Sequence, residues 1–272
     1  MRGIVSSVLA LLLLAACQND RGAAEKADWV PQLDTSFDCS ELPEVTAAQH
    51  VAPDGIFDDF IYMFMQDASL QRERIHFPLK CVIDGKETQI AAQDWKHDSI
   101  YSGQCEMTLI FDGKEIQDEA GGASAKSAIV EMVDLQSERI TLYHFLRTEK
   151  YWILNEIRKG ALNADSGRDF YVFYRRFVTD ESFQQQHIHD PFYFKTFDSD
   201  SFEEIEGWLE DVQWPDYRPF LPADKISNIV YDGKYPKSNY RSFVISSPSS
   251  GMNSILVFKR KGADWELVRL EN

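Results

Sequence analysis

The chain has 272 residues, of which 44% are hydrophobic, and its 44 acidic side chains outnumber 28 basic ones, which gives a formal net charge of −16. This hydrophobic content suffices for one large or two small globular cores. The negative charge would repel a polyanion, and no basic stretch with interleaved aromatic residues opposes it. Nucleic acid is therefore excluded as a predicted partner.

Residues 1–16 have the pattern of a secretory signal peptide. Arg2 precedes an apolar run over residues 4–16, which is too short to span a bilayer as a stable helix and ends in small residues. Residues 14–17, Leu-Ala-Ala-Cys, resemble the lipobox of bacterial lipoproteins. That resemblance implies a mature protein that begins at a lipidated Cys17, bears palmitate or similar acyl chains and is anchored to a membrane of the cell envelope.

The segment that follows the anchor is predicted to be a flexible tether. Residues 17–52 are polar and rich in alanine and lack a sustained hydrophobic period. Gln18 resembles the signal that sends lipoproteins onward to the outer membrane. The folded part is therefore expected to be lipid-anchored at the outer membrane, facing either the periplasm or the outside.

The remainder of the chain contains an internal duplication. Residues 57–78 recur without a gap 113 positions later, and self-similarity at a domain-sized period predicts two copies of one fold. The predicted domains are residues 53–160 and residues 161–272. The identical pairs are Phe57/Phe170, Phe60/Phe173, Phe64/Phe177, Asp67/Asp180, Ser69/Ser182, Gln71/Gln184, Ile75/Ile188, His76/His189 and Pro78/Pro191.

Each copy is predicted to place helices before strands. Phenylalanines at positions i, i+3 and i+7 form the apolar stripe of an amphipathic helix, and Asp67 and Asp180 are expected to cap a short second helix. The later part of each copy alternates apolar and polar residues between turn signals, which is typical of antiparallel strands. This order predicts an α+β fold in which the N-terminal helices pack on an antiparallel sheet.

The middle of the repeat is less regular. Trp95 matches Trp208 at the offset of 113, but the Asp-Gly-Lys motifs at 112–114 and 232–234 have an offset of 120 and favour Trp214 as its counterpart. Ser201 followed three residues later by Glu204 has the spacing of a capping box. We therefore expect a helix that carries Ile205 and Trp208.

Three cysteines remain beside Cys17, which is an odd number in a compartment where disulfides persist. One pair at most can form among Cys39, Cys81 and Cys105, and spacing leaves the pairing open. Because Cys81 and Cys105 both lie in strand-like stretches, a disulfide between them is the favoured prediction.

The phenylalanine-rich helix, the Arg-Ile-His-Phe-Pro-Leu segment at 74–79 and the segment at 214–232 resemble a lipoprotein family known as domain of unknown function 4348. The resemblance covers roughly residues 55–270. It implies two tandem domains similar to nuclear transport factor 2, each a curved sheet wrapped by helices into a cone. It implies no activity and no cofactor.

Two constellations carry chemistry. His187 and His189 would share one face of an extended segment and could offer two imidazoles to a metal ion, although Arg74 replaces the first of them in copy one and a structural role is favoured. Asp94, His97 and Asp98 flank Trp95 and have the residue types of general acid–base catalysis. Proximity in sequence is not convergence in space, so packing and surface roles are favoured here too.

No convergent catalytic motif accompanies these residues, so the favoured hypothesis is a membrane-anchored, non-enzymatic module. It would bind a small molecule, a polymer fragment or another envelope protein. One alternative is an isomerase, lyase or hydrolase with proton transfer by Asp94, His97 or Asp98 in the first domain. The other is a structural scaffold whose cones are filled by aromatic side chains.

Overall fold

The computed structural model describes residues 55–101, 106–116, 122–163, 168–198, 201, 203–235, 237–247 and 252–272. All of them belong to one compact unit, Ser36–Asn272. The predicted signal peptide, the lipidation site Cys17, the tether, Cys39 and Cys105 lie outside the described residues. In the described part, no helix has the length and apolar character needed to cross a membrane.

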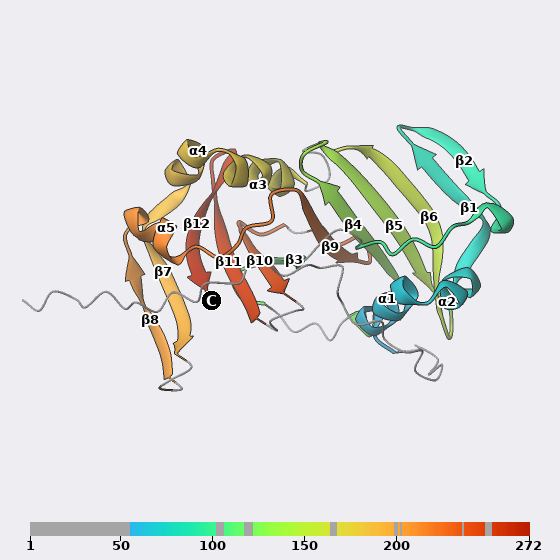
Figure 1. Cartoon of the computed structure of the whole chain (residues 1–272), viewed down its shortest axis with the longest axis horizontal. Helices are drawn as coiled ribbons and strands as arrows, with labels where there is room; N and C mark the ends of the chain where they lie inside the picture. The colour runs from blue at the N-terminus through green and yellow to red at the C-terminus, as the bar shows by residue number, and fades with distance from the viewer. Residues whose placement is uncertain are drawn as a thin grey trace, which may run out of the picture. The chain divides into compact units, whose positions relative to one another are not determined.

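Both halves of the chain begin with two helices and continue with strands, as predicted (Figure 1). The first half contains α1 (Phe57–Gln66), α2 (Ala68–Glu73), β1 (Ile75–Ile83), β2 (Lys86–Ile90), the short 3₁₀ helix η2 (Ala92–Asp94), β3 (Met107–Asp112), β4 (Ser127–Asp134), β5 (Arg139–Arg147) and β6 (Trp152–Ala161). The second half contains α3 (Asp169–Thr179), α4 (Glu181–Gln186), β7 (Ile188–Asp198), β8 (Glu203–Leu209), η5 (Asp211–Gln213), α5 (Trp214–Tyr217), β9 (Lys225–Tyr231), β10 (Tyr240–Ser247), β11 (Met252–Lys261) and β12 (Asp264–Glu271).

The predicted helix caps are confirmed. The Asp67 carboxylate accepts hydrogen bonds from the backbone N–H groups of Ser69 and Leu70, and Asp180 accepts one from Phe183. These bonds satisfy donors that the first turn of a helix leaves without a partner. The duplication therefore extends to the capping contacts of α2 and α4.

Two six-stranded sheets follow the same strand order. The first sheet is β2-β1-β6-β5-β4-β9 and the second, listed in the matching direction, is β8-β7-β12-β11-β10-β3. Both are mixed rather than antiparallel throughout, because β1 pairs with β6 and β7 with β12 in parallel. A parallel pair needs a long connection, and the intervening strands of each half provide it.

The two halves exchange one strand each, which the sequence did not predict. Strand β9 of the second half pairs with β4 in the first sheet, and β3 of the first half pairs with β10 in the second sheet. β3 and β9 also contact each other. There the Thr108 and Ser227 side chains hydrogen-bond to each other's backbone, and the backbone N–H of Ile110 donates to the side-chain carbonyl of Asn228 at 2.9 Å.

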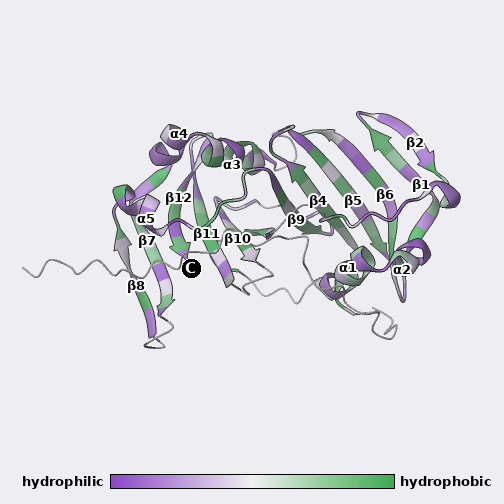
Figure 2. Ribbon diagram, viewed as in Figure 1, coloured by the Kyte–Doolittle hydropathy of each residue, from purple (hydrophilic) through white to green (hydrophobic). Residues whose placement is uncertain are grey.

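Aromatic rings fill the space between the helices and the sheet in each half. Figure 2 shows hydrophobic residues alternating with hydrophilic ones along the central strands and on the long helices. The rings pack with centroids about 5–6 Å apart, many of them edge to face. The buried rings are Phe57, Phe60, Phe64, Phe145 and Trp152 in the first half and Phe170, Phe173, Phe177, Phe243, Phe258 and Trp265 in the second.

The expected helix after Ser201 is wrong, because residues Glu203–Leu209 form strand β8. The Asp198 carboxylate accepts a hydrogen bond from the Ser201 hydroxyl, and β8 pairs antiparallel with β7. On β8, Trp208 lies opposite Tyr193 of β7, and the two rings meet edge to face. The cross-strand partners outweigh the local capping signal.

Trp214 is confirmed as the counterpart of Trp95. Both indoles are buried, and each donates its Nε1–H to a buried glutamine, Gln71 in the first half and Gln184 in the second. Trp208, the rejected alternative, is 66% exposed. Because the two Gln–Trp pairs are equivalent, the residues that surround them can be compared directly between the halves.

Candidate functional site

The interior of each half offers little room for a ligand, since its aromatic rings are buried and in mutual contact. The difference between the halves lies beside the Gln–Trp pair. There the same two residues lie in different surroundings, and in the second half a pocket adjoins the pair.

In the first half the glutamine is fully satisfied by the chain itself. The Gln71 side-chain oxygen accepts from the Trp95 indole at 3.0 Å and from the backbone N–H of Asp98 at 2.9 Å. Its amide nitrogen donates to the carbonyl oxygens of Phe64, at 3.2 Å, and Asp98, at 2.8 Å. The Asp98 backbone therefore occupies the place beside Gln71.

In the second half a guanidinium group replaces the backbone of that segment. The Gln184 oxygen accepts from the Trp214 indole at 2.8 Å and makes a long contact of 3.4 Å with Nη1 of Arg218. Its amide nitrogen donates to the Phe177 carbonyl at 2.8 Å. Among the described residues the second N–H of this amide has no acceptor, whereas its counterpart on Gln71 has one.

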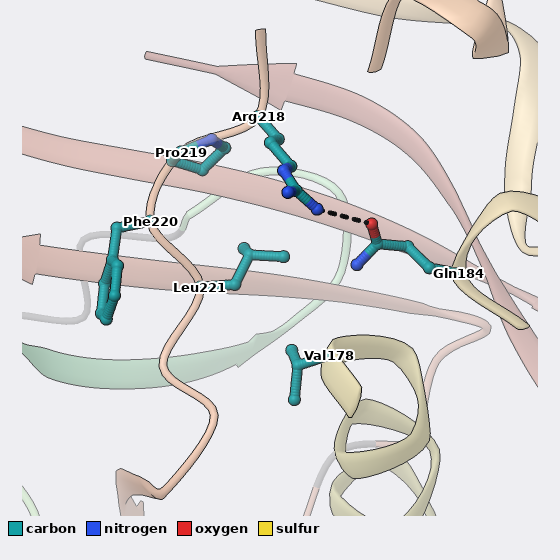
Figure 3. A pocket seen from close by; sticks show the side chains of 6 residues that line it. All are labelled: Val178, Gln184, Arg218, Pro219, Phe220 and Leu221. Atoms are coloured by element: carbon teal, nitrogen blue, oxygen red, sulfur yellow. Dashed lines mark hydrogen bonds between the residues drawn. The ribbon is translucent and has the colours of Figure 1, made fainter. Parts of the chain in front are cut away.

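A pocket of about 240 Å³ adjoins these groups. Figure 3 shows Arg218 reaching toward Gln184, with Leu221 and Val178 on the other side of the space and the Gln184 amide nitrogen turned toward Leu221. The walls are the C-terminal end of α3, Gln184 of α4 and the loop after α5. The lining residues are Val178, Gln184, Arg218, Pro219, Phe220 and Leu221.

Arg218 is the cationic group of this pocket. No carboxylate of the described residues lies within ion-pair distance of its guanidinium, although the chain carries a net charge of −16. The backbone N–H of Arg218 donates to the Trp214 carbonyl at 2.9 Å and closes α5, so the side chain starts from a fixed point. A guanidinium that is not paired with a carboxylate retains a planar set of donors suited to an oxyanion.

Exposed apolar side chains gather in the same part of the sequence. Five large ones lie within residues 205–220, whereas those of the first half are scattered from residue 56 to residue 146. Single exposed apolar residues are ordinary, and these five are neighbours along the chain, with Ile205 and Trp208 on opposite faces of β8. We call these five residues the β8–α5 surface: Ile205, Trp208, Val212, Tyr217 and Phe220.

The predicted acid–base residues are not joined to one another. Asp94 and His97 are exposed, and no side-chain hydrogen bond or ion pair in the described part links either of them to Asp98. The Asp98 carboxylate accepts from the Tyr143 hydroxyl at 2.8 Å and from the Ile100 backbone at 2.9 Å. Asp98 thus holds the segment that fills the first half, and proton transfer by these residues stays a prediction.

The two histidines do not share a strand face, because His187 ends α4 and the strand begins at Ile188. His187 stacks on Phe183 at 3.8 Å between centroids, and its Nδ1 lies 2.7 Å from the Phe183 carbonyl oxygen. His189 is exposed, with Nδ1 3.3 Å from a carboxylate oxygen of Glu266. In the described part of the chain, no group of three or more His, Cys, Asp or Glu side chains has the arrangement of a metal site.

Cys81 lies buried in β1 with a free thiol within the described residues. Its predicted partner Cys105 lies outside them, so the disulfide stays a prediction. Burial among apolar residues is the environment of an inert structural cysteine.

A buried polar cluster joins the two halves at another place. The fully buried carboxylate of Glu131 in β4 accepts hydrogen bonds from Arg168 and from the hydroxyls of Tyr171 and Tyr235. Burial, together with this carboxylate, raises the pKa of Tyr171 well above its usual value and that of Tyr235 to about 12, so both hydroxyls stay protonated and donate. Asn228 of the exchanged strand β9 donates to Tyr171 at 3.1 Å.

The fold and the site define an α+β protein of the NTF2-like kind. A crystal structure of an NTF2-like protein from Bacteroides fragilis NCTC 9343 is similar to this chain with a TM-score of 0.70 and 34% sequence identity, over 83% of this chain and 98% of that chain. The chain belongs to the family described as domain of unknown function DUF4348, whose model matches residues 37–272. No curated protein matches it.

The sequence did not single out Arg218 or the pocket. Gln184 is among the repeated residues and Trp214 is the favoured counterpart of Trp95, but the sequence did not predict their hydrogen bond. Arg218 has no identical counterpart near Asp98, so comparing the halves for identities passes over it. The signal that could have identified Arg218 is a difference between the halves, because the two sequences diverge immediately after the shared tryptophan.

Proposed function

We propose that this protein is a membrane-anchored, non-enzymatic binding module of the cell envelope, built as a tandem pair of cones. The carrying observation is the contrast between the halves. Aromatic rings fill both interiors, while the second half has a pocket with an unpaired cation and a concentration of exposed apolar residues. The matching strand order of the two sheets supports the tandem arrangement.

The role in binding is supported by where the polar groups lie. A binding pocket is concave and carries a few convergent polar groups, and the pocket beside Gln184 brings the Arg218 and Gln184 side chains together with Val178, Phe220 and Leu221. The residues with acid–base chemistry, by contrast, are exposed or engaged in holding a backbone segment. A binding role therefore accounts for more of the arrangement than catalysis does.

Site-specific photo-crosslinking in cells tests the binding role. With benzoylphenylalanine at Val212 of the β8–α5 surface, which is 68% exposed, we expect a discrete crosslinked species on a denaturing gel. The matched control is the same probe at Tyr62 of α1, which is 47% exposed and lies outside that surface. Equal labelling at both positions, or none at either, would contradict a protein partner at this surface, and combined with no saturable binding of a small ligand it would favour a structural scaffold.

Membrane anchoring is tested at Cys17. The apolar run, the small residues before the cysteine and Gln18 after it support lipidation. We expect the unaltered protein to incorporate labelled palmitate and to fractionate with membranes. The Cys17→Ala variant should incorporate none, because the thiol that would carry the acyl chain is gone, whereas Cys39→Ala should incorporate as much as the unaltered protein. Unchanged labelling of Cys17→Ala would contradict the anchor.

A further inference from the structure

We propose that the pocket beside Gln184 binds a small carboxylic acid with a compact apolar group, its carboxylate held by Arg218 and by the amide of Gln184. This inference rests on the proposed binding role and names the chemical class of its ligand. It is carried by the charge of the pocket, by its walls and by a direct comparison with the first half.

The charge of the pocket selects an anion. Arg218 has no carboxylate partner among the described residues, and its Nη1 makes only a long contact of 3.4 Å with the Gln184 oxygen inside the pocket. A neutral amide oxygen at that distance is a weak acceptor for a guanidinium. A carboxylate would form shorter, charge-assisted bonds, which are about twice as strong as bonds between neutral groups.

The first half provides an internal template for the occupant. There the amide nitrogen of Gln71 donates to the carbonyl oxygen of Asp98 at 2.8 Å, so an acceptor oxygen occupies the place beside the glutamine. In the second half the equivalent N–H of Gln184 lacks an acceptor in the described part of the chain, and the residue is 6% exposed. A buried donor without an acceptor is unfavourable, and a ligand oxygen at this place would remove that cost.

The walls select a compact apolar group. Val178, Phe220 and Leu221 line the pocket opposite the polar groups. The volume of about 240 Å³ lies below the usual range of pockets for drug-sized ligands. A single ring or a branched chain of a few carbons is therefore the matching size.

The experiment is a titration of the purified full chain with 4-fluorophenylacetate, followed by the fluorine resonance of the acid. We expect saturable binding, and we expect 4-fluorophenylacetamide, which has the same shape without the charge, to bind at least tenfold more weakly. Arg218→Met should weaken binding of the acid tenfold or more, because it removes the cation and keeps an apolar stem. Arg139→Met removes an equal charge from an exposed pair with Asp84 and should leave binding unchanged.

A second variant separates the pocket from general ion binding. Leu221→Trp fills the space while keeping Arg218, and it should abolish saturable binding with circular dichroism unchanged. Equal binding of acid and amide, equal losses in the two arginine variants, or no saturation by the unaltered chain would overturn the inference. Photo-crosslinking at Val212 is independent of this titration, so a crosslink without acid binding would reject the ligand class and leave the binding role standing.

Discussion

Replacing Glu131 with leucine is expected to lower the free energy of unfolding by about 3–5 kcal/mol. The Glu131 side chain is fully buried and that of its partner Arg168 is 13% exposed. The substitution would leave the guanidinium without a counter-charge and two tyrosine hydroxyls without their acceptor. An uncompensated buried charge costs far more than the net gain from the intact pair.

Urea unfolding followed by circular dichroism measures this change. Glu87→Leu is the matched control, because Glu87 is 60% exposed in its ion pair with Lys80 and a surface pair contributes about 0–1 kcal/mol. The double variant Glu131→Leu, Arg168→Met should recover a large part of the loss, since it removes the stranded charge as well. Similar effects of Glu131→Leu and Glu87→Leu would contradict the assigned role of the cluster.

Local features of this fold could be predicted from the sequence because the same residue pattern occurs in both copies of the repeat. The stripe of phenylalanines, the capping aspartates and the pairing of Trp95 with Trp214 depend on residues close together in the chain or on one alignment. The prediction of a helix after Ser201 was wrong, because the contacts of Trp208 with the neighbouring strand outweighed a capping pattern of two polar residues.

The strand exchange could not be predicted for a physical reason. β3 and β9 are equivalent strands, so the side chains of either could line the edge of either sheet. The choice is made by contacts far apart in sequence, such as Ile110 in one core with Phe243 and Asn228 beside Tyr171. No repeat period or local propensity contains that information.

The candidate site also differs between what neighbouring residues in the sequence suggest and what the fold brings together. Asp94, His97 and Asp98 attracted attention because they are neighbours in sequence, yet the fold turns two of them outward. The pocket instead joins Val178 of α3 and Gln184 of α4 to a loop more than thirty residues further on. Its signal is the difference between the halves beside the shared glutamine, where the first half places the Asp98 backbone and the second half places the Arg218 side chain.

Because of the strand exchange, the two halves are expected to fold only together. Residues 1–163 made alone would lack β9, which leaves the β4 edge of the first sheet open, and β3 would lose the partners of Ile110. Residues 168–272 would have the converse defects. We expect neither purified half to unfold cooperatively in urea as a monomer, whereas the two halves made together should form a one-to-one complex with a single transition.

A chain with a protease site inserted between residues 163 and 168 is the matched control. Cleaved after folding, it should keep a single transition, because the exchanged strands hold the pieces together without the peptide bond. A stable, monomeric first half would contradict the expectation, since β3 would then have folded back onto β4 in the place of β9. In that case the strand exchange would result from the covalent connection between the halves. The hydrogen bonds between Thr108 and Ser227 would then not be its cause.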